Sequence, residues 1–147
     1  MDTLVYESAE NALDQAIVTR LKDVITDDNT KYVPIFTQIP KGEVFPYIKV
    51  GEKFSNDSFR TKTSYGESVM VRIHAFSQTQ GTKEINNITS QIKAAIGGNY
   101  LDLSAAGFNN VVMNMSQSRI FQDEAGGSDF GYTHHAVIEI EFKIQKT

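Results

Sequence analysis

The chain has 147 residues, no cysteine and a formal net charge of -4. A chain of this length can bury roughly 70% of its unfolded surface, so we expect residues 1–147 to form a single domain around its own core. The lack of cysteine excludes a disulfide framework, a thiolate zinc site and a cysteine nucleophile. The acidic balance argues against a nucleic-acid-binding protein, because such proteins need a basic surface.

Nothing in the sequence predicts a membrane partner. No run of about 18 apolar residues occurs, so we expect no membrane span. The first residues, "MDTLVYESAE", are acidic where a signal peptide needs positive charge. We therefore expect the protein to be made in the cytoplasm.

The first half of the chain predicts one helix and two short strands. Apolar residues recur at steps of three and four over Ala9–Val24, which indicates an amphipathic helix that ends before the turn-rich Thr26–Thr30. The strands Tyr32–Phe36 and Pro46–Glu52 follow. Three prolines in this region favour edge strands or broken strands, because proline donates no ladder hydrogen bond.

The stretch "VFPYIKVGE", Val44–Glu52, combines strand formers with Pro46 and Gly51. Neither a helix opening nor a lysine-serine pair follows the glycine, so the stretch is no phosphate-binding loop. We interpret Pro46 as the entry to the second strand and Gly51 as its exit into a polar loop.

The second half predicts a long strand, a helix and two further strands. Alternation indicates strands at Glu67–Ser77, Asn110–Ile120 and Tyr132–Ile144, and the isoleucine stripe of Ile85–Ile96 indicates a helix. Each strand alternates one apolar with one polar face, as in antiparallel sheets. The fold class we predict is α+β: a mainly antiparallel sheet of four to five strands with two helices on one face.

Two long polar loops are predicted, at about 53–66 and 122–131. The first is locally basic and the second is acidic. We hypothesise that one of them reaches a neighbouring copy or a partner and becomes ordered only on association; the alternative is two solvated hairpin tips. The candidate assembly residues are Lys53, Asp57, Arg60, Lys62, Asp123, Glu124 and Asp129.

Candidate catalytic groups are few. Strand neighbours point to opposite faces, so His134 and His135 cannot both bind one ion unless a bulge lies between them, and at most one can join His74. We interpret them as interfacial or half-exposed histidines. Glu139 and Glu141 are expected to be solvated neighbours on a wet face. We expect no catalytic residue, no metal and no cofactor.

The order of the segments resembles that of the tail-completion, or tail-terminator, proteins of long-tailed bacteriophages and prophage elements. After the first helix, "VPIFTQIPKGEVFPYIKVGE" looks like the family's proline and glycine block, and the polar "SNDSFRTKTS" follows it. "VRIHAFSQTQGTKEINNITSQI" is similar to its strand, aromatic-serine step and helix. "RIFQDEAGGSDFGYTHHAVIEIEFKI" is similar to its acidic loop and last strand. Phe76 replaces the family's usual tryptophan.

This resemblance implies a structural protein of the virion, at the head-proximal end of the tail. Such proteins form a ring, usually of six copies, on the last ring of tail tube protein. They stop tube growth and offer a surface to the head completion or connector protein, and DNA only passes through the ring.

Three alternatives stay open beside this expectation. The first is another head–tail neck or connector component of similar size. The second, from a different class, is a small metal-dependent enzyme that uses His74 and His134. The third is a small-molecule-binding α+β module, to which no motif points.

Overall fold

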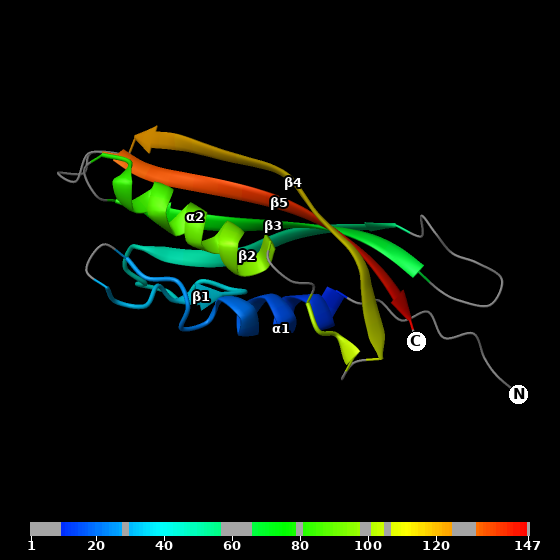
Figure 1. The fold of residues 1–147 in the computed structure, drawn as a ribbon. Helices are drawn as coiled ribbons and strands as arrows, with labels where there is room; N and C mark the ends of the chain where they lie inside the picture. Colours follow the sequence, from blue (N-terminus) through cyan, green and yellow to red (C-terminus); the bar gives the residue numbers. More distant parts are fainter. Residues whose placement is uncertain are drawn as a thin grey trace, which may run out of the picture.

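The computed structural model describes residues 10–27, 30–56, 66–78, 81–97, 101–104, 107–124 and 132–146. Two helices and five strands follow one another along the chain (Figure 1). They are α1 (Glu10–Leu21), β1 (Ile35–Phe36), β2 (Tyr47–Asn56), β3 (Gly66–Ser77), α2 (Lys83–Gly97), β4 (Phe108–Glu124) and β5 (Tyr132–Lys146).

The strands form one mixed sheet with the order β1-β2-β3-β5-β4. β2, β3, β5 and β4 pair antiparallel, while the two-residue β1 runs parallel to β2. The predicted α+β class with a mainly antiparallel sheet is confirmed. β3 lies at the centre, where its apolar alternation allows it to pair along its whole length with β5.

Both helices cover the same face of the sheet (Figure 1). α1 packs over β1 and β2, and α2 packs over β3, β5 and β4. Both bury their isoleucine and leucine stripes against alternate residues of the strands, so the core is one layer between helices and sheet. Its central members are Leu13, Ile17, Leu21, Ile48, Val71, Ile73, Ile85, Ile88, Ile92, Ile96, Ile138, Ile140 and Phe142.

Side chains also join the two helices and the turn after α1. Arg20 Nη1 donates to the Ala95 carbonyl oxygen at 3.0 Å. Gln91 Nε2 donates to the Thr26 carbonyl oxygen at 2.8 Å, and its Oε1 accepts from the Thr26 amide at 2.9 Å. The first bond satisfies a carbonyl in the last turn of α2, which has no helical partner, and the other two join Thr26, beyond the end of α1, to α2. No helix in the described part of the chain is long and apolar enough to cross a membrane.

In the first half of the chain, three element bounds differ from the prediction. α1 ends at Leu21, three residues early, because Asp23 adopts a left-handed conformation (φ 57°). The first strand shrinks to Ile35–Phe36, since it pairs with β2 at only two positions. Gly51 does not end the second strand: β2 passes through it to Asn56, with a register shift between Val50 and Lys53.

The predicted loops are shorter at their starts than expected. Residues 53–56 belong to β2 and residues 122–124 belong to β4. Both strands continue because their partners β3 and β5 supply ladder hydrogen bonds to polar as well as apolar residues. The rest of the two predicted loops, 57–65 and 125–131, lies outside the described residues.

Candidate assembly surface

The face of the sheet that the helices leave uncovered carries the polar and aromatic side chains; we call it the open face. The strand registers place alternate residues of β2, β3, β5 and β4 on it. Its members include Tyr47, Lys49, Glu52, Phe54, Met70, Arg72, His74, Phe76, Gln117, Arg119, Phe121, Thr133, His135, Val137, Glu139, Glu141 and Lys143.

A row of rings crosses one end of the open face over four strands. Tyr47 lies between Phe45 and Phe76, with ring centroids 5.1 Å away on each side. His135 stacks on Phe76 at 4.4 Å and meets the edge of Phe121 at 4.6 Å. Because such pairs stabilise a sheet beyond the area that they bury, this row fixes β2, β3, β5 and β4 relative to one another.

The histidine pair lies beside this row. His74 Nδ1 is 2.8 Å from His135 Nε2, and His74 Nε2 is 3.1 Å from Glu52 Oε1. One of the two facing nitrogens donates the proton of this bond and the other accepts it. Desolvation opposes ionisation of Glu52, but His74, its own backbone and Arg72 together lower the pKa of that carboxyl.

Gly51 makes room for this arrangement. A Cβ atom at position 51 would lie 2.5 Å from Cδ2 and 2.6 Å from Nε2 of His74. The imidazole therefore rests directly against the backbone of β2 at its register shift. Only glycine leaves that space, so the glycine belongs to the site rather than to a turn.

An ionic network continues the open face toward β4. Arg72 Nε donates to Glu139 Oε1 at 2.7 Å, and Arg72 Nη1 lies 3.4 Å from Glu52 Oε2. Gln117 Nε2 donates to the second Glu139 oxygen at 2.9 Å, and the Phe54 ring lies 5.0 Å from the Arg72 guanidinium carbon. The hydrogen bond from Arg72 is the main reason that the pKa of Glu139 is lowered despite its burial.

Two expectations about these residues are corrected. Glu139 is 8% exposed and holds two partners, so it is not a solvated neighbour of Glu141. The partner of His74 is His135, as the alternation of β5 allows, whereas His134 pairs in register with Ser77 on the helix-covered face. His74 and His134 lie on opposite faces of the sheet, so the alternative of a metal-dependent enzyme that uses both is wrong.

His134 itself is buried, and its Nδ1 has no hydrogen-bond partner among the described residues. Beside it on the sheet, the Ser77 hydroxyl donates to Glu84 at 2.8 Å, in the first turn of α2. Within the described ranges, no group of three or more histidine and carboxylate side chains is arranged to hold a metal ion.

The predicted assembly residues fall in different places. Lys53 lies in β2, where the register shift turns it to the helix side, and its Nζ is 3.0 Å from Asp14 Oδ2 in α1. Asp123 and Glu124 belong to β4. The remaining candidates lie outside the described residues; they are Asp57, Arg60, Lys62 and Asp129.

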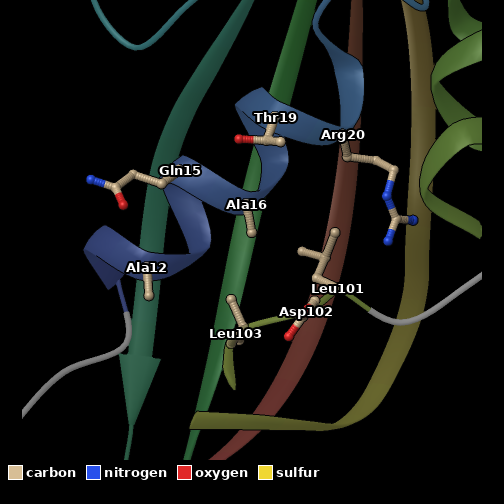
Figure 2. A pocket seen from close by; sticks show the side chains of 8 residues that line it. All are labelled: Ala12, Gln15, Ala16, Thr19, Arg20, Leu101, Asp102 and Leu103. Carbon is tan, nitrogen blue, oxygen red and sulfur yellow. The ribbon is translucent and has the colours of Figure 1, made fainter. Parts of the chain in front are cut away.

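A hollow of about 440 Å³ opens between α1 and the segment 101–103. Figure 2 shows Ala12 and Ala16 on the side of α1 that faces Leu101 and Leu103. Its lining residues are Ala12, Gln15, Ala16, Thr19, Arg20, Leu101, Asp102 and Leu103. Both leucines belong to the core, so we expect the floor to be firm and apolar.

Sequence reasoning missed the open-face cluster of Glu52, Arg72, His74, His135 and Glu139. The alternation of β3 and β5 could have placed Arg72, His74 and Glu139 on polar faces. It could not show which residues lie opposite each other, because that depends on the register between strands.

Three findings relate the chain to known proteins. The model of a family described as "Tail completion protein gp17" matches residues 15–145. Tail completion protein gp17 of Bacillus phage SPP1 is 27% identical over 142 residues, which cover 96% of this chain and 98% of the relative. A chain in the structure "Virion of native gene transfer agent (GTA) particle" aligns with a TM-score of 0.70 and 13% identity, over 95% of this chain and 99% of that one. This last likeness shows the fold alone.

Proposed function

Since the chain belongs to the tail completion protein gp17 family and is a structural protein of the bacteriophage virion, we propose that it closes the tail tube as a ring of identical copies. In this proposal the ring holds six copies, stops tube growth and offers its other side to the head completion or connector protein. The family match over residues 15–145 is the observation that carries the proposal. The family is structural, and no catalytic role is proposed.

The distribution of uncovered surface supports assembly. Helices cover one face of the sheet, and the open face has no cover from the described residues. β4 pairs with β5 on one side only, and no other described strand lies along its outer edge. Long open edges are a liability in a free monomer, and a ring with interfaces that close can cover them.

The open face is also suited to line the channel of the proposed ring, through which DNA would pass without binding. Acidic and basic side chains both lie on it, and Arg72 is already paired with Glu139 and Glu52. Phosphate binding needs unpaired basic groups that can displace counterions. In the proposed ring, DNA therefore only passes through.

Electron microscopy of purified protein mixed with isolated tail tubes tests the proposed function. We expect annular particles of the protein alone and one added ring at a single end of each tube. Native mass spectrometry gives the number of copies, which we expect to be six. Binding along the tube wall, or binding to emptied heads without binding to tubes, would contradict the proposal and favour a neck component.

A further inference from the structure

The end of β4 presents two partly exposed apolar side chains. Ile120 is 42% exposed and Phe121 is 40% exposed, and they are neighbours on the edge strand. The register sets Phe121 opposite His135, on the open face, together with the exposed Arg119 two residues earlier. Arg119 and Phe121 are therefore spaced by about 6–7 Å on one face of the strand. Exposed apolar side chains on a strand edge are normally covered by a partner.

The hollow between α1 and the segment 101–103 has the complementary features. Figure 2 shows the small side chains of Ala12 and Ala16 facing Leu101 and Leu103, and they leave room for an incoming group between them. Asp102 lies at its border, exposed to solvent. Ser104 fixes the Asp102 carboxylate with hydrogen bonds from its hydroxyl at 2.6 Å and from its amide at 3.0 Å. The hollow thus has an apolar part formed by alanines and leucines, polar walls that include Arg20, and a fixed negative charge at its border.

We propose that the end of β4 of one copy docks into the hollow of the next copy. Phe121 enters between α1 and the segment 101–103, and Arg119 pairs with Asp102. A second copy of this chain is the occupant because the chain itself supplies an aromatic side chain and a positive charge to match the apolar floor and the negative border. This inference rests on the proposed ring and names the contact that builds it.

The end of β4 and the hollow lie at different places on the chain, which decides what kind of assembly the contact can build. In Figure 1 the end of β4 lies far from α1 and from the segment 101–104. The two surfaces are different parts of the chain, so the contact is heterologous: each copy uses its β4 end on one side and its hollow on the other. Heterologous contacts that close form rings, whereas a self-complementary contact would stop at a dimer.

Charge reversal tests the contact, because both residues are exposed and neither belongs to the core. Arg119→Glu, Asp102→Arg and the double variant are compared with the unchanged protein by sedimentation velocity over a range of concentrations. Lys41→Glu, an equal charge change in an exposed turn, is the matched control. Circular dichroism and thermal unfolding of each variant show whether the monomer is folded.

We expect each single reversal to raise the concentration needed for assembly at least tenfold. The double variant should assemble within about threefold of the unchanged protein, and so should Lys41→Glu. Folded single variants that assemble normally would overturn this contact without contradicting the proposed ring. A folded double variant that does not regain assembly would do the same. Unchanged protein that stays monomeric on its own and at tube ends would overturn both the contact and the ring.

Discussion

Replacement of Gly51 by alanine tests whether His74 is held where the structure places it. The new Cβ would lie 2.5 Å from the His74 ring, about 1 Å inside ordinary contact, so the ring must move. That movement breaks the bonds of His74 to Glu52 at 3.1 Å and to His135 at 2.8 Å. Two such bonds contribute about 1–3 kcal/mol.

Part of this loss is offset, because alanine restricts the unfolded chain and stabilises by about 0.4–1 kcal/mol where its backbone conformation is allowed. Gly51 has no positive φ, so that condition holds. The net expectation for Gly51→Ala is a loss of about 1–2 kcal/mol in the free energy of unfolding. At this chain length, the loss lowers Tm by about 2–8 °C. Urea titration and calorimetry measure both quantities.

Two controls separate the contact with the His74 imidazole from effects of the backbone at position 51. Gly97→Ala, at the end of α2, places a Cβ with nothing within 4 Å and should be neutral or slightly stabilising. In a His74→Ala background, Gly51→Ala should no longer lower the free energy of unfolding, although the Arg72 carbonyl oxygen would still lie 3.1 Å from the new Cβ. An equal cost of Gly51→Ala in both backgrounds would refute the reasoning, because the strain would then not come from the imidazole.

Two further substitutions test the ionic contacts. Glu139→Gln should lower the free energy of unfolding by about 1–2 kcal/mol at pH 7. Urea titrations should show this loss shrinking as pH falls below 4.5, because a group with a lowered folded pKa loses its stabilising contribution as it protonates. A loss that does not change with pH would contradict the Arg72–Glu139 pair. Lys53→Ala should lower the free energy of unfolding by about 1 kcal/mol, because the Asp14 side chain, only 20% exposed, loses its partner. The Lys53→Ala/Asp14→Ala double variant should recover part of this loss. Fully additive losses of the two single variants in thermal unfolding would count against the pair.

The sequence predicted the fold well where one face of an element is apolar throughout. Val69, Val71 and Ile73 alternate as the central strand requires, and the isoleucine stripe of α2 sets its buried side. The bounds were less predictable where polar residues continue a strand, as in β2 beyond Gly51. There the partner strand decides, and the local pattern does not report it.

The open-face cluster could be predicted only in part. Alternation assigns His74 to the face opposite the core and shows that His134 and His135 must separate. The contacts of His74 with Glu52 and His135 join three different strands. The register shift at Gly51 brings Glu52 under His74, and no periodicity of the sequence indicates a shift of that kind.

The length of tails made without this protein tests its proposed role most directly. Electron microscopy of a lysate from a phage or prophage that lacks only this gene gives the distribution of tube lengths. We expect tubes much longer than normal and without heads, and a return to normal length when the gene is supplied in trans. Tubes of normal length in the deletion would contradict a role in ending tail growth.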